Sequence, residues 1–420
     1  VATTTTTTPL GTNYGSYRKT STFNAPPPRS HRSNEVRRGR GDVERAASPP
    51  GEINNHTPSR LPKDKRLAKD SVNDVINNES RTDENNTAGA AKSSSSPPPS
   101  SAIHNFAPRI SVVGIGGAGG NAVNNMIRRG LTGVDFLAMN TDSQHLSTVL
   151  AESRLQIGVE LTNGLGCGAN PDAGRQAAEE SRDEIVSALS PSHMVFITAG
   201  MGGGTGTGAA PVVAELCYNA NILTVAVVTK PFLFEGKHRM RLAEEGLERL
   251  RDVVDTLIVI PNQNIFAMID HTTSFRDSFA LADDVLLAGV RSITDLMTSP
   301  GYINLDFADV QTVMHGMGNA MLGTGEAEGG DRATEAAMQA LTNPLLGHME
   351  IGTAKGMLVN ITGGDDMTLF EVERAAQTIC ESVEDDTANI IFGSSHDAEM
   401  EGHIRVSVVA TGIEETPTRN

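Results

Sequence analysis

A seven-residue segment, Gly202–Gly208, holds five glycines and two threonines. It follows an apolar run, Met194–Ala199, and precedes a segment of helical composition that begins near Ala209. Glycines let the backbone turn sharply from a strand into a helix, so that the first N–H groups of the helix face an anion. The segment predicts a phosphate-binding loop, and a tight turn without a ligand is the alternative.

A second glycine-rich segment, Gly114–Asn121, also joins an apolar run to a helical segment. Its glycine spacing satisfies the dinucleotide-binding fingerprint of oxidoreductases. In those enzymes an acidic residue at the end of the second strand binds the ribose, and the matching place here holds Asn140-Thr141-Asp142. An NAD-dependent oxidoreductase therefore stays open as an alternative. Neither glycine segment ends in the Lys-Ser/Thr pair of a Walker A motif. Helix dipoles and a bound Mg2+ are therefore expected to offset much of the phosphate charge.

Apolar runs alternate with helical segments beyond residue 108, which predicts an α/β fold with a parallel sheet covered on both faces. A long central helix is expected within 274–299, because apolar residues recur there three and four apart. A smaller α+β unit is expected after it. The expected strands are 110–113, 134–139, 194–198, 223–228, 256–260, 355–361, 389–392 and 404–409, and the other expected helices include 121–129, 174–189, 238–251, 309–322 and 331–341.

Residues 1–107 differ in composition from the rest of the chain, being rich in Thr, Ser, Pro, Asn and Arg. Too few apolar residues are present to offset the entropy of ordering, so we expect a disordered leader. Its Arg- and Ser-rich, acid-poor start is typical of a transit peptide, and a flexible tail without a targeting role is the alternative. The expected divisions are a leader over 1–107, a nucleotide-binding domain over 108–273 that carries both glycine-rich segments, the central helix over 274–299, a C-terminal domain over 300–416 and a tail over 417–420.

Charge and cysteine content exclude several functions. The leader carries 15 basic and 10 acidic residues, whereas the remainder carries 19 basic and 41 acidic residues, which argues against nucleic acid as a partner. Cys167, Cys217 and Cys380 are too widely spaced for a zinc site and give no disulfide framework, so a reducing compartment is expected. No apolar run approaches the ~18–20 residues that span a bilayer.

The segment Gly202–Gly208 resembles the signature of the tubulin and FtsZ superfamily. From about Arg109 to Ile413 the chain resembles FtsZ, the bacterial-type cell-division GTPase family. Its residues look most similar to those of the alphaproteobacterial members, for example in Val195–Pro211 and Ala388–Gly393. The resemblance implies a filament-forming protein that hydrolyses GTP to GDP and phosphate and forms a division ring. The other matching segments are Gly116–Asn121, Asn140-Thr141-Asp142, Gly164–Pro171, Phe234-Glu235-Gly236, Pro261-Asn262 and Asn304–Asp309.

The resemblance also implies roles for individual residues around GTP. Glu235 and Arg239 match a pair that contacts the ribose, although residues four apart on a helix also form simple ion pairs. Asn262 and Asp283 match the residues that read guanine, and Phe279 lies one helical turn before Asp283, where it can stack on the base. No side chain is assigned as a direct metal ligand. The residues matching the phosphate contacts are Gly117, Ala118, Gly119, Gly120, Asn121, Gly204, Thr205 and Gly206.

The acidic segment Asn304–Asp309 matches the catalytic loop of the family. Asp306 and Asp309 are three apart at the start of a helix, where carboxylates can orient an attacking water or simply cap the helix. In the family this loop, with Asn304, acts on the nucleotide of the next subunit. The resemblance therefore implies a head-to-tail homopolymer whose active sites are completed only on assembly.

Two departures from the family pattern affect the expected partners and location. Cys167 occupies a position usually held by a small residue such as Ala. The family's C-terminal peptide that binds membrane tethers does not follow the globular part in this sequence, either because this variant lacks it or because the sequence is truncated, so membrane recruitment is expected to be indirect. The leader and the alphaproteobacterial resemblance together favour the mitochondrial matrix, with plastid stroma and bacterial cytoplasm as alternatives. A catalytically weak paralogue that copolymerises with a second homologue is the remaining alternative function.

Overall fold

We describe the protein from a computed structural model, in which the described residues are 108–413 without 271, 300, 347–350 and 384–386. The predicted leader over 1–107 and the predicted tail over 417–420 lie outside these residues. Within them, ten strands form one sheet in the order β3-β2-β1-β4-β5-β6-β7-β10-β8-β9. The sheet is parallel from β3 to β7, and β10 runs antiparallel to both of its neighbours, β7 and β8.

The first six strands are short, and all but the edge strand β3 are mostly apolar. All six residues of β1 are buried, because helices cover both faces of the sheet at this point. The hydrogen-bonded order places β1 and β4 beside each other, each followed by a glycine-rich turn into a helix. The strands are β1 (Ile110–Ile115), β2 (Asp135–Asn140), β3 (Ser153–Gln156), β4 (Met194–Gly200), β5 (Leu223–Lys230) and β6 (Thr256–Pro261).

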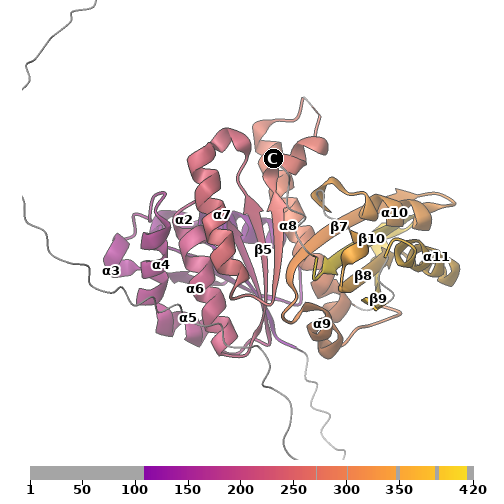
Figure 1. The fold of residues 1–420 in the computed structure, drawn as a ribbon, viewed down its shortest axis with the longest axis horizontal. Helices are drawn as coiled ribbons and strands as arrows, with labels where there is room; N and C mark the ends of the chain where they lie inside the picture. Colours follow the sequence, from indigo (N-terminus) through magenta and orange to yellow (C-terminus); the bar gives the residue numbers. More distant parts are fainter. Residues whose placement is uncertain (1–107, 271, 300, 347–350, 384–386, 414–420) are drawn as a thin grey trace, which may run out of the picture. The chain divides into compact units, whose positions relative to one another are not determined.

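Helices pack on this half of the sheet in two layers, each with its own apolar core. Side chains of α1, α8 and α9 form one core with one face of the strands, and side chains of α5, α6 and α7 form another core with the opposite face. Figure 1 shows α6 and α7 side by side across the sheet. The helices are α1 (Gly116–Arg128), α2 (Ser143–Ser147), α3 (Val159–Thr162), α4 (Pro171–Glu180), α5 (Arg182–Leu189), α6 (Thr205–Asn219) and α7 (Lys237–Arg251).

The long helix α8 (Phe275–Thr298) lies between the two groups of strands (Figure 1). Its start is fixed by Ser274, whose side chain accepts a hydrogen bond from the backbone N–H of Asp277. One face of α8 is apolar and buried against the sheet. At its far end Thr298 packs closely against Gly133, which lies just before β2. The helix therefore runs from the carboxyl ends of the parallel strands to their amino ends.

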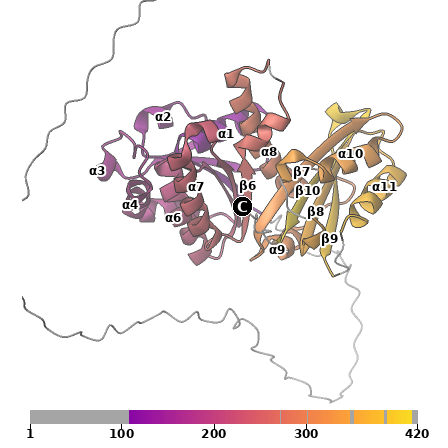
Figure 2. The same ribbon diagram turned by 45° about the horizontal axis from the view of Figure 1, so that its top comes forward.

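The second group of strands carries its own helices. Figure 2 shows α10 and α11 beside one another next to β7, β10 and β8, and these elements share a third apolar core. The elements are α9 (Phe307–Met314), β7 (Gly318–Glu328), α10 (Arg332–Leu341), β8 (Gly356–Gly363), α11 (Leu369–Cys380), β9 (Asn389–His396) and β10 (His403–Thr411). Short 3-10 turns occur at η1 (Leu233–Glu235), η2 (Asn262–Ala267), η3 (Pro344–Leu346), η4 (Ile351–Thr353) and η5 (Ala398–Met400).

Two predicted helices differ from the structure. The helix expected over 309–322 ends at Met314, and residues from Gly318 onward form β7, because Gly316 and Gly318 adopt positive φ angles and the following residues pair with β6 and β10. The helix expected over 174–189 is two helices separated by Ser181. The Ser181 backbone leaves the helical region, and its hydroxyl accepts a hydrogen bond from the Gly158 N–H at 3.1 Å.

Candidate functional site

The N-termini of α1 and α6 meet where the two glycine-rich segments leave β1 and β4. Neither helix has a side-chain cap, and neither has an acidic residue in its first turn. Gly116 has a φ of 74°, and a Cβ on it would lie 3.0 Å from the backbone nitrogen of Gly206. Two sets of free N–H groups and two positive helix ends thus converge, which is the arrangement that binds anions.

A cavity of about 420 Å³ opens at this point. Its size is within the range of small-molecule sites. Of the residues predicted to contact the nucleotide, nine line the cavity: Gly117, Ala118, Gly204, Thr205, Gly206, Glu235, Arg239, Asn262 and Phe279.

The remaining predicted phosphate residues do not line the cavity. Gly119 and Gly120 are buried beneath it, and a Cβ on Gly119 would lie 2.4 Å from the carbonyl oxygen of Thr198. Asn121 is exposed, and its side-chain oxygen lies 3.2 Å from Nε2 of His145. Gly119 therefore lets α1 pack against β4, whereas a Cβ on Gly120 would lie 3.0 Å from the His145 ring, and this packing places Gly117 and Ala118 at the cavity.

Hydroxyl groups connect the glycine-rich segment Gly202–Gly208 to the turn that follows β2. The Thr205 and Thr141 hydroxyls lie 2.7 Å apart, and the Cys167 thiol donates to Thr141 at 3.4 Å. The Gly202 N–H donates to the hydroxyl of Thr207 at 2.8 Å, which closes the loop before α6. Thr205 faces the cavity and is available to a phosphate oxygen, whereas Thr207 is buried and supports the loop.

The pair Glu235 and Arg239 lies on one wall of the cavity. Their charged groups are 2.9 Å apart, and the Glu235 carboxylate also accepts the Phe232 N–H at 2.8 Å. The Glu235 side chain is largely covered, whereas half of the Arg239 side chain is exposed. The ion pair expected from their spacing is present, and both side chains remain within reach of a ligand in the cavity.

The far end of the cavity combines an aromatic ring with an amide that lacks a partner. Asn262 is 7% exposed, and its Oδ1 atom makes no hydrogen bond within the described residues. Phe279 lines the same wall and contacts the rings of Phe232 and Phe275, with centroids 5.3 Å and 4.9 Å away. A buried acceptor without a donor is costly, so this end fits a flat ligand that carries N–H groups, such as a purine base.

Asp283 lies on α8 one turn beyond Phe279 and does not line the cavity wall. Burial, and to a smaller extent the neighbouring Asp284 carboxylate, raises the pKa of its carboxyl from 3.8 to about 7. A strongly shifted carboxyl beside a cleft is a common property of binding and catalytic groups. Asp283 therefore remains a candidate for base recognition, one helical turn beyond the Phe279 ring that lines the cavity.

Several lining residues were not predicted as contacts. They include Asn140, Asp142 and His145 after β2, and Leu165–Gly168 in the loop before α4. Two of these stretches could have been predicted from the sequence, because Asn140-Thr141-Asp142 and Gly164–Pro171 match segments of the FtsZ family. His145 lies in no matching segment. It reaches the cavity because Asp142 caps α2 by accepting the His145 N–H at 3.0 Å.

The acidic segment Asn304–Asp309 lies at the amino ends of the parallel strands, opposite the cavity. Asp306 precedes α9, and the ring of Phe307 contacts that of His193, which lies immediately before β4, with centroids 6.4 Å apart. In Figure 1, α9 accordingly appears at the lower end of the view. Asn304, Asp306 and Asp309 do not line the cavity of their own chain. Their side chains and the glycine-rich segments therefore occupy opposite ends of the parallel strands.

Within the described residues no cluster of three or more His, Cys, Asp or Glu side chains is arranged to hold a metal ion. A divalent cation at this site would depend on phosphate oxygens, with hydroxyls such as that of Thr205 as additional oxygen ligands. For the same part of the chain, every helix is too short or too polar to cross a membrane.

A second cavity, of about 690 Å³, lies between α8 and the strands β7, β10 and β8. It is the larger of the two, but it lacks the converging helix N-termini found at the first cavity. Its walls carry paired charges, including Arg405 with Glu326 at 2.8 Å. The smaller cavity therefore remains the candidate nucleotide site.

Comparisons with known proteins identify both halves of the described chain. A family model described as Tubulin/FtsZ family, GTPase domain, matches residues 109–270. A second model, FtsZ family, C-terminal domain, matches residues 318–414. A cell division protein FtsZ from Wolbachia is 59% identical over 319 residues, which are 73% of this chain and 80% of that protein. The FtsZ of Caulobacter vibrioides is 60% identical over 73% of this chain, and the match spans 60% of that protein.

Solved structures have the same fold. An empty FtsZ dimer from M. jannaschii aligns with a TM-score of 0.70 and 46% identity, covering 73% of this chain and 88% of that chain. CetZ2 from Haloferax volcanii, a GTPγS-bound protofilament, aligns with a TM-score of 0.64 and 21% identity over 74% of this chain and 94% of that chain. At that identity the second likeness concerns the fold alone.

Proposed function

The chain belongs to the Tubulin/FtsZ family, and from that premise we propose that it binds GTP, hydrolyses it to GDP and phosphate, and assembles head to tail into filaments. The observation that carries the proposal is the convergence of the uncapped N-termini of α1 and α6 on one cavity. This arrangement supplies backbone donors and dipoles for a polyphosphate without a lysine.

The proposed orientation of GTP follows from the chemistry of the two ends of the cavity. Gly117, Ala118 and Gly204–Gly206 surround the phosphates, and Glu235 with Arg239 faces the ribose. Phe279 stacks on the base, while Asn262 Oδ1 gains the donor that it lacks. An ionised Asp283 accepts from the ring N–H and exocyclic amine of guanine, which adenine does not offer in that pattern.

A magnesium ion is proposed together with the triphosphate. The phosphate oxygens and the Thr205 hydroxyl would hold it, and it would supply positive charge against the phosphates. The chain's own contribution is to orient the triphosphate with backbone N–H groups, so that the reacting phosphorus faces the open end of the cavity.

The separation of Asp306 and Asp309 from the cavity supports hydrolysis between subunits. Both lie at the amino ends of the strands, whereas the cavity lies at the carboxyl ends. Stacking one subunit on the next in the same orientation brings the acidic segment of one copy to the cavity of its neighbour. Such a heterologous contact does not close on itself and gives open filaments. Carboxylates arriving there orient a water and take its proton.

For the cell, we propose that these filaments form a ring that acts in the division of a cell or an organelle. The similarity to FtsZ from Wolbachia, Caulobacter and Rickettsia and the basic, acid-poor first fifty residues support a mitochondrial location. Imaging the tagged full chain beside mitochondrial and plastid markers tests the location. Diffuse signal outside both organelles would contradict it.

Sedimentation of the purified chain with GTP, with GDP and with ATP tests the biochemical proposal. We expect pelletable polymer and phosphate release with GTP only. Release of phosphate from GTP at equal rates in dilute monomer and in polymer would contradict completion of the site by a neighbour. Polymer that appears only after a second FtsZ-like protein is added would favour the regulatory paralogue instead.

A further inference from the structure

The nucleotide cavity contains a thiol. Cys167, in the loop before α4, lines this cavity and is half-buried, so its sulfur is open to a small molecule that enters there. All three cysteines of the chain lie within the described residues, and the other two are elsewhere. Cys217 is buried in the core formed by α5, α6 and α7 with the sheet, and Cys380 is exposed at the end of α11.

The loop that carries Cys167 packs directly against the phosphate-binding segment. A Cβ on Gly204 would lie 2.9 Å from the Cys167 Cβ and 2.3 Å from the carbonyl oxygen of Gly168. The Cys167 thiol donates to the Thr141 hydroxyl, which in turn lies 2.7 Å from the hydroxyl of Thr205. These contacts occupy the protein side of the sulfur. A group attached to it therefore extends into the cavity, beside the residues that surround the phosphates.

A second observation shows that Cys167 lies inside a site built for a ligand. Asn262 lines the same cavity and is 7% exposed, and its Oδ1 atom has no hydrogen-bond partner among the described residues. A buried acceptor of this kind needs a donor, which a molecule in the cavity can supply. The thiol and the ligand of Asn262 thus share one confined space of about 420 Å³.

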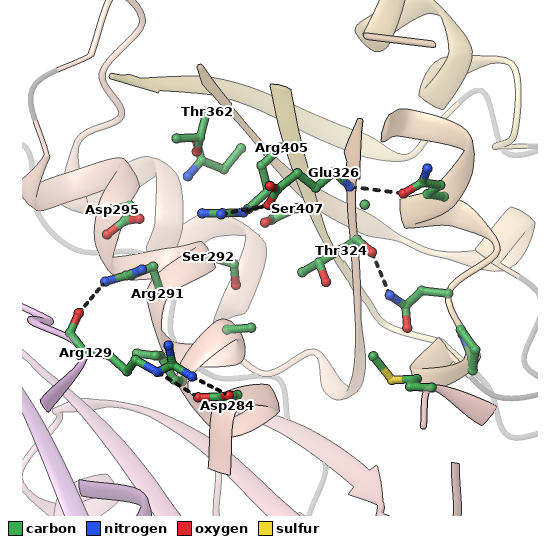
Figure 3. Close-up of a pocket in the computed structure, with 18 of the residues that line it drawn as sticks. Arg129, Asp284, Arg291, Ser292, Asp295, Thr324, Glu326, Thr362, Arg405 and Ser407 are labelled. Atoms are coloured by element: carbon green, nitrogen blue, oxygen red, sulfur yellow. Dashed lines mark hydrogen bonds and ion pairs between the residues drawn. The ribbon is translucent and has the colours of Figure 1, made fainter. Parts of the chain in front are cut away.

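The larger cavity offers no comparable group. Figure 3 shows Arg129 facing Asp284 and Arg405 facing Glu326 in its walls, and each of these ion pairs measures 2.8 Å. The described residues that line it include no cysteine. Of these two cavities, a thiol reagent can therefore react only in the nucleotide cavity.

We propose that Cys167 is a redox-sensitive modification site, at which a small disulfide such as glutathione disulfide forms an adduct that excludes the nucleotide. The inference rests on the proposed function, because it assumes that the phosphates of GTP lie beside Gly204 and Thr205. Glutathione also brings carboxylates, which repel phosphate. Modification of one thiol would thus switch off nucleotide binding, and with it assembly.

The reaction is thiol–disulfide exchange. The Cys167 thiol gives its proton to the solvent, and its sulfur attacks one sulfur of the disulfide. The disulfide bond breaks as the new S–S bond to Cys167 forms, and the other half leaves as a thiolate that takes up a proton. Cys167 is oxidised and the departing glutathione is reduced. Dithiothreitol reverses the step by the same exchange.

The adduct and the nucleotide are expected to exclude each other, and the other two cysteines provide internal controls. Bound GTP should protect Cys167, whereas Cys380, which lies outside both cavities, should react equally with and without GTP. Burial raises the pKa of the Cys217 thiol to about 12, so this residue should stay unmodified.

The test is to treat the full chain with glutathione disulfide, with and without GTP, and to follow each cysteine by mass spectrometry. GTP at about 100 times its dissociation constant should slow modification of Cys167 at least about tenfold. Protein modified without GTP should bind a fluorescent GTP analogue at least about tenfold more weakly, and dithiothreitol should restore the affinity.

Two variants assign the effect to one thiol. Cys167→Ala should have the same GTP affinity before and after treatment, whereas Cys380→Ser should remain as sensitive as the wild type. Cys167 that stays unmodified without GTP, or modified protein that binds GTP with unchanged affinity, would overturn the inference. An untreated wild type that binds no GTP, while Cys167 still reacts, would instead contradict the proposed function itself.

Discussion

Asp306 and Asp309 cap each other at the start of α9: the Asp309 N–H donates to Asp306 Oδ1 at 2.9 Å, and the Asp306 N–H donates to Asp309 Oδ2 at 3.2 Å. This reciprocal capping box holds both carboxylates at the exposed beginning of the helix. Capping and catalysis were alternatives at the sequence level. The capping is present, and it fixes the position from which either carboxylate would act on a neighbouring subunit.

Two substitutions of Asp309 separate these roles. Asp309→Asn keeps an oxygen that accepts the Asp306 N–H, whereas Asp309→Ala removes this acceptor but leaves the Asp306 N-cap, at a cost of about 0.5–1.5 kcal/mol in the free energy of unfolding. If the carboxylate acts on the neighbour's GTP, both variants bind GTP and assemble but lose phosphate release by about 10²-fold or more. Phosphate release at the wild-type rate by Asp309→Asn would reduce the role of Asp309 to capping.

Gly117→Asp tests the anion site without straining the backbone. A Cβ on Gly117 would lie 3.9 Å from the nearest atom, Nε2 of His145, so the side chain has room. A carboxylate in the first turn is favourable for an isolated helix but repels phosphate. We expect the melting temperature to be unchanged or higher, while GTP binding is lost. Gly330→Asp, at an open position far along the chain, is the matched control and should bind GTP normally.

Asn262→Leu is expected to affect stability and binding in opposite directions. Asn262 Oδ1 is buried without a partner, so removing the polar group should leave the nucleotide-free protein equally stable or more stable. GTP affinity should fall by about 10- to 100-fold, because a guanine donor is then left unpaired. Among the described residues, Oγ1 of Thr198 in β4 is a second buried group without a partner, and it lies outside the cavity, so Thr198→Val should leave affinity unchanged. Equal affinity in Asn262→Leu and the wild type would remove Asn262 from the base site.

Asp295 makes the stability of the fold depend on pH. Burial raises the pKa of its carboxyl from 3.8 to about 6, although Arg291 and Arg405 oppose the shift. Because the folded state binds the proton more tightly than the unfolded state, this contribution is complete below about pH 4 and is lost as the pH rises through about 6. Asp295→Asn should therefore raise the free energy of unfolding by about 1–3 kcal/mol at pH 8 and by little at pH 4.

Denaturant titration of Asp295→Asn at pH 4, 6 and 8 measures this difference. Asp252→Asn, which removes an exposed carboxylate after α7, serves as the control for loss of one charge. A gain in stability that is the same at all three pH values would show that the Asp295 carboxyl does not titrate as described.

Much of the α/β half of the fold was predictable from local pattern. The strands expected at 110–113, 194–198 and 256–260 lie within β1, β4 and β6, because buried parallel strands are continuous apolar runs. Prediction failed where the outcome depends on distant partners. The residues that form β7 are apolar enough for a helix, and only pairing with β6 and β10 makes them a strand.

In the site, too, the features set by local sequence were predictable and those set by distant contacts were not. The two glycine-rich segments were predictable, since a strand-to-helix turn needs glycine at positions such as Gly116. The contribution of His145 was not, because it depends on how α2 is capped and folds over α1.

The central claim is that each active site is completed by the next subunit, and mixing two defective variants tests it most directly. Gly117→Asp has an intact acidic segment but no phosphate site, and Asp309→Asn has an intact cavity but lacks the catalytic carboxylate. Each alone is expected to release no phosphate from GTP. The account predicts that an equimolar mixture regains phosphate release, because the Asp309 of one variant reaches the GTP held by the other. A mixture as inactive as its components, with Asp309→Asn still assembling on GTP, would contradict it.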